Sequence, residues 1–218
     1  MKFFIDTANI DEIKELNDWG VVDGVTTNPS LIYKSGKDFK NTIKEISNII
    51  QGPISAEVTS VEYKDMVKQG LELAEISSNV VIKVPLNENG LLACKKLSSK
   101  NIKVNVTLCF SSSQAILAAK MGATYISPFI GRLDDISTQG LSLIEDIVQI
   151  YENYPLDLNT QVLVASIRSP LQVSQAASMG AHVATIPPKI VKQMIKHPLT
   201  ESGLETFMED WKKTGQDF

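Results

Sequence analysis

The sequence predicts an α/β fold, a (β/α)8 TIM barrel with an additional C-terminal helix, and two observations carry that prediction. Short runs rich in β-branched residues recur along the chain, and a helical pattern follows each of them. The runs begin on average about 26 residues apart, which is typical of strand–helix repeats in a parallel sheet. The eight runs are 2–6, 24–27, 54–59, 80–84, 103–108, 124–129, 161–167 and 182–186.

The stretches between these runs have the apolar spacing of amphipathic helices. In one of them Phe39, Ile43 and Ile46 share a helical face. No linker or low-complexity tract divides the chain, so one barrel domain is expected over 1–218. No G-x-G-x-x-G motif follows the first run, which argues against a dinucleotide-binding open sheet. Four glycines are expected at helix ends: Gly20, Gly70, Gly122 and Gly180.

The C-terminal part extends beyond the helix that completes the barrel, which we expect at 189–195. Residues 200–218 predict one more helix and a tail, because Ser202 and Glu205 have the spacing of a capping box. This helix either packs on its own barrel or packs on a neighbouring subunit. Its apolar stripe comprises Leu204, Phe207, Met208 and Trp211.

The composition excludes several classes of function. The 218 residues carry a net charge of −4, so no basic field indicates nucleic acid. The cysteines Cys94 and Cys109 and the histidines His182 and His197 have no metal-site spacing, and we expect no metal. Acidic residues come too early for a signal peptide, and no apolar run approaches membrane-spanning length. A cytoplasmic protein without membrane contact is expected.

Polar residues occupy positions where a purely structural barrel would place branched apolar side chains. Barrel enzymes carry their chemistry at the C-terminal ends of strands, where residues two apart share the inward face. The inward set comprises Asp6, Thr26, Asn28, Glu57, Lys83, Asn105, Thr107, Ser127, Phe129, Ser166 and Arg168. The apolar neighbours expected to face outward are Ile82, Val84, Val104, Val106, Leu163 and Ala165.

Lys83 is the most informative of these residues because it stands within the apolar run VVIKVP. A buried unpaired ammonium group is costly, so such a lysine tends toward the neutral amine. A neutral amine in a dry pocket is a nucleophile for carbonyl groups. The structural alternatives are a lysine that reaches solvent from an edge strand and an ion pair with Glu57.

The other polar residues allow both a structural and a catalytic interpretation. Asp6 either caps the helix that begins near Ile10 or serves as the acid/base in carbon–carbon cleavage. Glu57 either pairs with the lysine or, together with Thr107, holds a water that transfers protons. Asn28 lies in the Asn-Pro turn of GVTTNPSL, which taken alone indicates only a turn.

Two arginines and a serine near the sixth and seventh runs predict a phosphate site. Arg132 lies just past the sixth run, Ser166 lies near the end of the seventh, and Arg168 follows it directly. Guanidinium groups with a hydroxyl suit a phosphate, and barrels often bind phosphate near strands seven and eight. The alternative is a set of salt bridges to Asp134 or Asp135.

The sequence resembles the transaldolase family, and the match runs over nearly the whole chain. GVTTNPSLI at 24–32 is similar to the family's N-terminal signature. VVIKVPLNENGLLACKKL at 80–97 is similar to its Schiff-base lysine signature. One departure is Asn87, which occupies a place where the family usually has Ser or Thr. It lies beyond the strand, so we expect it to affect a loop.

The resemblance implies a cofactor-free transaldolase that moves a dihydroxyacetone unit between sugar phosphates, in the non-oxidative pentose phosphate pathway. Lys83 would form the Schiff base, Asp6 would be the acid/base, and Glu57 with Thr107 would hold the catalytic water. The length resembles the short single-barrel branch, whose members often form pentamer-based decamers that exchange the C-terminal helix. The residues implied in binding hydroxyls are Asn28, Asn105 and Ser127, and those implied in binding phosphate are Arg132, Ser166 and Arg168.

The nearest alternative is a fructose-6-phosphate aldolase, a lyase with nearly the same barrel and lysine. As far as the resemblance goes, Glu57 stands where the aldolases tend to carry Gln. Phe129 stands where they carry Tyr, and Arg168 where they tend to carry Lys. All three positions favour transfer. Two further alternatives are a barrel that binds sugar phosphates without turnover and an unrelated phosphate-binding isomerase.

Overall fold

Eight parallel strands close into a barrel in the computed structural model, which describes residues 1–217. Each strand pairs with the next along the chain, and β8 pairs with β1 to close the sheet. The predicted (β/α)8 fold is confirmed. The strands are β1 (Lys2–Asp6), β2 (Gly24–Thr26), β3 (Ile54–Glu57), β4 (Val80–Pro85), β5 (Val104–Cys109), β6 (Tyr125–Pro128), β7 (Gln161–Val164) and β8 (Val183–Ile186).

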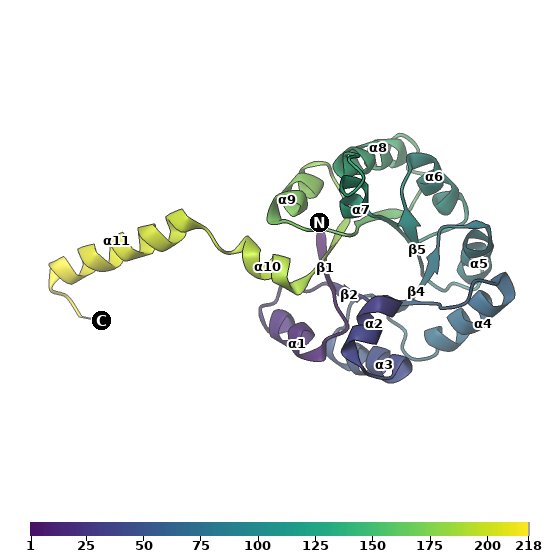
Figure 1. Cartoon of the computed structure of the whole chain (residues 1–218), viewed down its shortest axis with the longest axis horizontal. Helices are drawn as coiled ribbons and strands as arrows, with labels where there is room; N and C mark the ends of the chain where they lie inside the picture. Colours follow the sequence, from purple (N-terminus) through teal and green to yellow (C-terminus); the bar gives the residue numbers. More distant parts are fainter. Residues whose placement is uncertain (218) are drawn as a thin grey trace.

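Helices surround the barrel as an outer ring (Figure 1). The ring and its connections comprise α1 (Ile10–Asp18), α2 (Pro29–Ser35), α3 (Phe39–Ile49), α4 (Tyr63–Ala74), α5 (Glu88–Ser98), α6 (Ser112–Lys120), α7 (Ile130–Asp134), α8 (Gly140–Asn153), α9 (Pro170–Ser178) and α10 (Pro188–Met194). The short helices α2 and α7 are additional to one helix per strand. They follow β2 and β6 and lie on opposite sides of the barrel opening in Figure 1.

The strands bury apolar side chains on both faces, as expected for a parallel sheet covered by helices. The outward residues Ile82, Val84, Val104 and Val106 belong to the main core between barrel and helices, as predicted. A separate cluster fills one end of the barrel interior, and the Phe4 and Tyr125 rings in it meet edge to face at 5.9 Å. This interior cluster comprises Phe4, Val81, Tyr125, Leu163 and Val183.

The predicted facing of strand β7 is wrong. Leu163 belongs to the interior cluster and Ala165 lines an interior cavity, whereas Val162 and Val164 pack outward against the helices. The cause is that the strand ends at Val164, before the residues from which its phase was inferred. Strict alternation of side chains holds only while the backbone stays extended.

Three of the four glycines expected at helix ends are confirmed. Gly20, Gly122 and Gly180 follow α1, α6 and α9 with φ of +74°, +80° and +83°. Gly70 is different, because it lies inside α4. A Cβ atom there would approach the Leu97 side chain to 2.9 Å, so this glycine allows α4 to pack closely on α5.

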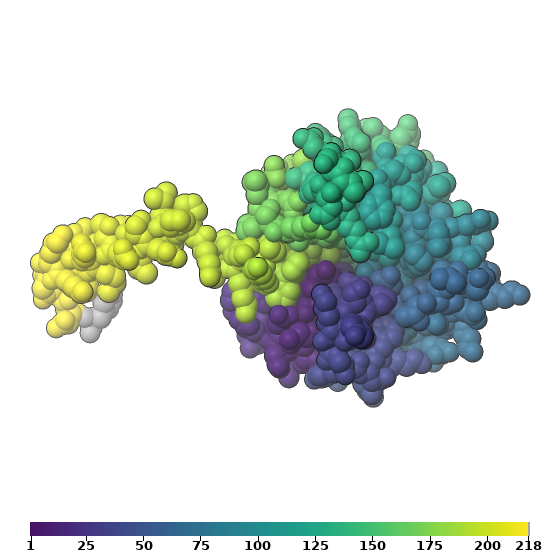
Figure 2. Space-filling model, viewed as in Figure 1, coloured from purple at the N-terminus to yellow at the C-terminus, as the bar shows by residue number. Residues whose placement is uncertain are grey.

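The last helix, α11 (Pro198–Thr214), extends away from the barrel, as Figures 1 and 2 show. None of its residues is buried, so in this structure it does not pack on its own barrel. The predicted capping box is wrong, because the helix already begins at Pro198 and the ring of His197 accepts the Leu199 amide at 3.2 Å. A proline in the first turn favours this earlier start. Within residues 1–217, no helix is long and apolar enough to cross a membrane.

Candidate active site

Lys83 lies on the inward face of β4 with 4% of its surface exposed. Its Nζ is 3.0 Å from Glu57 Oε2 and donates a hydrogen bond to the Thr27 carbonyl at 3.1 Å. The strand register pairs Glu57 directly with Lys83, which fixes the contact. The ion-pair alternative is therefore present in the structure, and the alternative of a lysine that reaches solvent is wrong. Removing either charge would leave the other without its ion-pair partner in a largely buried setting.

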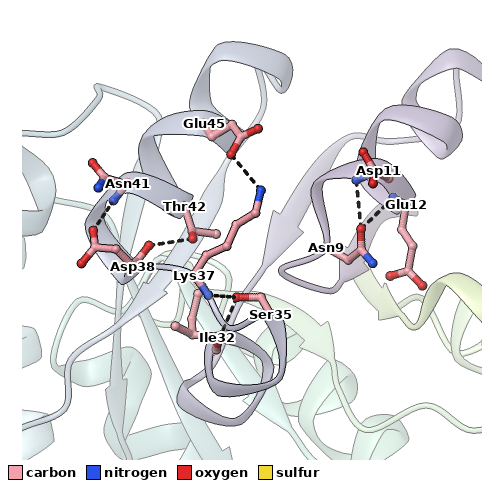
Figure 3. Close-up of polar contacts among 10 residues, drawn as sticks. All are labelled: Asn9, Asp11, Glu12, Ile32, Ser35, Lys37, Asp38, Asn41, Thr42 and Glu45. Carbon is pink, nitrogen blue, oxygen red and sulfur yellow. Dashed lines mark hydrogen bonds and ion pairs between the residues drawn. The ribbon is translucent and has the colours of Figure 1, made fainter.

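Asp6 ends β1 beside Thr26 of β2, and the Thr26 hydroxyl donates to Asp6 Oδ1 at 2.8 Å. Burial raises the pKa of Asp6, while the positive charge of Lys83 and the hydrogen bond from Thr26 lower it. The helix-capping alternative for Asp6 is wrong. Asn9 caps α1, since its Oδ1 accepts the amides of Asp11 at 2.9 Å and Glu12 at 3.3 Å (Figure 3).

A chain of buried polar side chains crosses β3, β5 and β6 near the lysine. Ser127 Oγ donates to Asn105 Oδ1 at 2.7 Å, and Asn105 Nδ2 donates to Ser55 Oγ at 3.1 Å. These bonds hold the amide group of Asn105 in one orientation. The Thr107 hydroxyl is also buried, but it has no hydrogen-bond partner among the described residues. Buried hydroxyls are normally satisfied, so this oxygen is suited to bind a small polar ligand.

Two cavities meet at the lysine, one of about 170 Å³ and one of about 340 Å³. Ten of the twelve predicted site residues line at least one of them. The structure thus brings together most of the set read from the strand ends. Lys83, Asn28, Phe129 and Arg132 line both cavities. Asn105 lies deeper, in contact with Ser127, and Arg168 lines neither cavity.

Asn28 has the local role that its turn motif predicts and also faces the site. Its Oδ1 accepts the Leu31 amide at 2.9 Å and so caps α2. The same residue lines both cavities beside Lys83. Capping holds the short helix α2 at the barrel opening, which keeps Asn28 next to the lysine.

The two predicted phosphate-binding arginines have different surroundings. The Arg132 guanidinium lies over the Phe129 ring, 5.0 Å from its centroid, and lines both cavities. Arg168 instead binds both carboxylate oxygens of Asp135 on the exposed rim. The salt-bridge alternative is therefore present for Arg168. Because both partners are about half exposed, the pair contributes little stability.

Ser166 reaches the smaller cavity through a bend in the backbone rather than through the strand pleat. Its φ is +62°, an uncommon conformation for a residue with a side chain. The Gly131 amide donates to the Ser166 carbonyl at 3.1 Å, and a Cβ at Gly131 would meet that oxygen at 2.2 Å. The glycine lets α7 approach the loop that carries Ser166 and Arg168.

Two buried hydroxyls at the site were missed in the sequence. Ser55 contacts Asn105, and Thr185 contacts the Thr26 hydroxyl and lines the smaller cavity. Both lie on the inward face, Ser55 two residues before Glu57 and Thr185 two residues after Val183 of the interior cluster. Applying the same period of two to β3 and β8 would have found them.

A third cavity, of about 500 Å³, lies beside the barrel opening. Its lining includes Asn9 and Glu12 around the start of α1, Ser35 at the end of α2 and Lys37 in the turn before α3, and Figure 3 labels these four residues. Lys37 is held by an ion pair with Glu45 at 3.3 Å. Asp6 is the one predicted site residue on this cavity, so its carboxyl lies between the outer cavity and the lysine site.

The cysteines are buried away from this chemistry. Burial raises the pKa of Cys94 to about 11 and that of Cys109 to about 12, so both thiols stay protonated at neutral pH. Across the part of the chain that the structure describes, no three His, Cys, Asp or Glu side chains are grouped to hold a metal ion.

Fold and site together define a class: a (β/α)8 barrel with a buried lysine amine and a carboxylate pair at the C-terminal ends of its strands. The comparison with known families agrees, because the family model described as Transaldolase/Fructose-6-phosphate aldolase matches residues 3–218. The chain belongs to this family and is an enzyme of the transaldolase/aldolase type.

Close relatives cover the same length. A "Probable transaldolase" of Thermoanaerobacter sp. (strain X514) is 57% identical over 215 residues, 99% of each chain. That of Clostridioides difficile (strain 630) is 59% identical over 212 residues, 97% of each chain. That of Thermodesulfovibrio yellowstonii is 59% identical over 213 residues, 98% of this chain and 99% of the relative. The short chain of 218 residues fits the single-barrel branch of the family.

Proposed function

We propose that this protein is a transaldolase that moves a dihydroxyacetone unit from a ketose phosphate to an aldose phosphate. The donor would be fructose 6-phosphate or sedoheptulose 7-phosphate, and the acceptor erythrose 4-phosphate or glyceraldehyde 3-phosphate. The observation that carries the proposal is the buried amine of Lys83, which faces two cavities, pairs with Glu57 on the neighbouring strand and shares the smaller cavity with Asp6.

In the first step Lys83 Nζ attacks the ketone carbon of the donor and forms an imine with loss of water. The attacking nitrogen must first lose a proton, and the 3.0 Å contact with Glu57 Oε2 supports this carboxylate as the acceptor. The buried Thr107 hydroxyl, free of protein partners among residues 1–217, supports a role in holding the departing water. Protonation of the imine nitrogen gives a cationic iminium, which is the electron sink of the reaction.

In the second step Asp6 takes the proton of the hydroxyl next to the bond that breaks. The carbon–carbon bond electrons flow into the iminium, so an aldose phosphate leaves and a three-carbon enamine stays on Lys83. The enamine then attacks the acceptor aldehyde, and Asp6 returns the proton to the new hydroxyl. Hydrolysis of the imine releases the product ketose. Burial raises the pKa of Asp6, whereas Lys83 and Thr26 lower it. A carboxyl group under such opposing effects suits a step in which it first takes up and then returns a proton.

Substrate binding is assigned to the remaining residues of the site. We assign the sugar hydroxyls to Asn28, Thr26, Asn105 and Ser127, and the phosphate to Arg132, Ser166 and Arg168. Of the three phosphate-binding residues, Arg132 has the strongest structural support, because it lines both cavities. For Arg168 to bind phosphate, the phosphate must compete with the exposed carboxylate of Asp135.

The choice of transfer over simple cleavage rests on Phe129. Its ring lines both cavities beside Lys83 and has no group that donates a proton. The enamine is then protonated slowly and waits for an aldehyde. A fructose-6-phosphate aldolase is the second candidate, because the family includes that activity.

We further propose one barrel domain over 1–218 and a homo-oligomer, a pentamer or decamer, in which α11 packs on a neighbouring subunit. The exposed apolar side chains of Leu204, Phe207 and Met208 on a helix that leaves the barrel support this. Deleting the residues after Pro198 should lower the mass measured by light scattering. A monomeric wild type would contradict the proposal. We place the enzyme in the cytoplasm, in the non-oxidative pentose phosphate pathway.

Product analysis with fructose 6-phosphate tests the proposed activity. With erythrose 4-phosphate present, we expect sedoheptulose 7-phosphate and glyceraldehyde 3-phosphate. Without an acceptor, the enzyme should release little free dihydroxyacetone. Brisk release without an acceptor would replace the transaldolase assignment by the aldolase.

A further inference from the structure

Thr185 is a buried hydroxyl to which the mechanism above gives no role. It lies on the inward face of β8 with 3% of its surface exposed, and it lines the smaller cavity. Strand β1 stands between β8 and β2, and the register pairs Phe4 with Thr185 and Asp6 with Thr26. Three polar side chains on adjacent strands therefore face the same interior space.

The hydrogen bonds among these side chains have a fixed order when Asp6 is ionised. Thr26 Oγ1 lies 2.8 Å from Asp6 Oδ1 and 2.5 Å from Thr185 Oγ1. A carboxylate only accepts hydrogen bonds, and a hydroxyl has one proton to donate. The Thr26 proton must therefore point at Asp6, and Thr26 must accept from Thr185. Donation runs from Thr185 through Thr26 to Asp6.

We propose that Thr185 is a positioning residue that acts through Thr26 to hold Asp6 as an oriented carboxylate. The inference rests on the proposed role of Asp6 as the base in carbon–carbon cleavage. A proton donated by Thr185 occupies the Thr26 oxygen, so the Thr26 proton stays directed at Asp6. Hydrogen bonds in such a chain also strengthen one another at low local dielectric.

Other charged groups surround Asp6 and stay the same when only the Thr185 hydroxyl is removed. Lys83, paired with Glu57, and Arg132 face it from the barrel side. Four charged residues share the outer cavity with Asp6: Asp11, Glu12, Lys34 and Lys37. A comparison of variants at position 185 therefore isolates the contribution of one hydroxyl.

The expected direction follows from the forces on Asp6. Burial raises the pKa of this carboxyl, and the Thr26 hydrogen bond lowers it. Without the Thr185 hydroxyl the Thr26 bond weakens, so the carboxylate is less favoured and the pKa rises further. A base works only when ionised, so the acidic limb of kcat/KM should move to higher pH, by about 0.5–1 unit.

The test compares Thr185→Val, which keeps the shape and removes the hydroxyl, with Thr185→Ser, which keeps the hydroxyl. The matched control is Thr160→Val, because Thr160 is also buried and its hydroxyl bonds the Ala123 carbonyl at 2.7 Å, away from the two lysine cavities. Carbon-13 NMR of carboxyl-labelled aspartate follows Asp6 in the free protein, with Asp6→Asn used to assign its signal. The kcat/KM for transfer is measured over the same pH range.

Thr185→Val should raise the NMR midpoint of Asp6 and shift the kinetic limb with it. Both should stay at the wild-type values in Thr185→Ser and Thr160→Val. An unchanged midpoint in Thr185→Val overturns the proposal, even if activity falls, because that loss would reflect packing. A raised midpoint with an unmoved kinetic limb confirms the hydroxyl chain and instead overturns Asp6 as the base in the proposed function.

Discussion

Two layers of side chains inside the barrel differ in character although they come from the same strands. The lower layer is the buried apolar interior cluster, and the upper layer, two residues further along each strand, faces the cavities and is polar except at Ala165, just past the end of β7. The side chains of both layers point in the same direction, since residues two apart share a face. The pairs are Phe4 and Asp6 on β1, Val81 and Lys83 on β4, Tyr125 and Ser127 on β6, and Val183 and Thr185 on β8.

The difference indicates that the lower layer mainly stabilises the fold, whereas the upper layer carries the groups proposed for catalysis. Burying an apolar side chain in the lower layer stabilises the barrel by about 1.5–3 kcal/mol. The upper layer instead buries an ion pair at Lys83 and Glu57, and such pairs are often no more stabilising than apolar residues of equal size. Substitutions two residues apart on one strand should therefore affect different properties.

The two layers can be compared most directly on β1, where Phe4 lies in the lower layer and Asp6 in the upper layer. Asp6→Asn should lower kcat/KM by about 10²–10⁴-fold, because the base is lost, with little change in the free energy of unfolding. Phe4→Ala should cost about 3–5 kcal/mol of unfolding free energy, because a fully buried ring is removed. Steady-state kinetics and urea unfolding measure the two effects. If Phe4→Ala lost as much activity per folded molecule as Asp6→Asn, the separation of layers would be refuted.

A smaller effect is expected from Phe129, which lies two residues beyond Ser127 on the same face. Phe129→Tyr adds one hydroxyl near the enamine, and a well-placed acid contributes about 10²-fold or more to protonation. Release of free dihydroxyacetone from fructose 6-phosphate should therefore rise while transfer to erythrose 4-phosphate falls. Assay of both products with one enzyme preparation provides the measurement. Unchanged partitioning would mean that Phe129 does not decide between transfer and cleavage.

How far the layers could be predicted depends on the strand. On β1 and β4 a polar residue follows apolar ones, so Asp6 and Lys83 reveal the inward face in the sequence alone. On β7 residues 162–165 are all apolar, so both faces look alike and the phase was inferred from residues beyond the strand. Ser166 still reaches the cavity, but through a positive φ that no periodicity reveals.

The rim was the least predictable part of the site. The sequence offered Asp134 and Asp135 as partners for either arginine, and only the fold selects the pair of Arg168 with Asp135. The chain of hydrogen bonds from Thr185 through Thr26 to Asp6 also depends on which strands are neighbours in the closed barrel. Local patterns specify which face a residue occupies, whereas contacts between strands follow from closure.

The smallest expected effect concerns the two arginines on the rim. Arg132→Ala should lower kcat/KM for phosphorylated donors, because this guanidinium lines the cavities. The loss should correspond to about 2 kcal/mol or more of transition-state binding free energy. Arg168→Ala should act in the same direction but less, since Asp135 already binds this arginine. Transfer of the dihydroxyacetone unit from an unphosphorylated donor should change much less in both variants. Equal losses with and without phosphate would make the arginines structural.

The central claim, that Lys83 is the nucleophile, is tested most directly by trapping the covalent intermediate. Borohydride in the presence of fructose 6-phosphate should reduce the imine to a stable secondary amine. Peptide mass mapping should then place the adduct on Lys83, and Lys83→Met should show neither adduct nor activity. Chelators should leave trapping intact, because the iminium takes up the electrons. An adduct on any other lysine, or full activity in Lys83→Met, would contradict the mechanism.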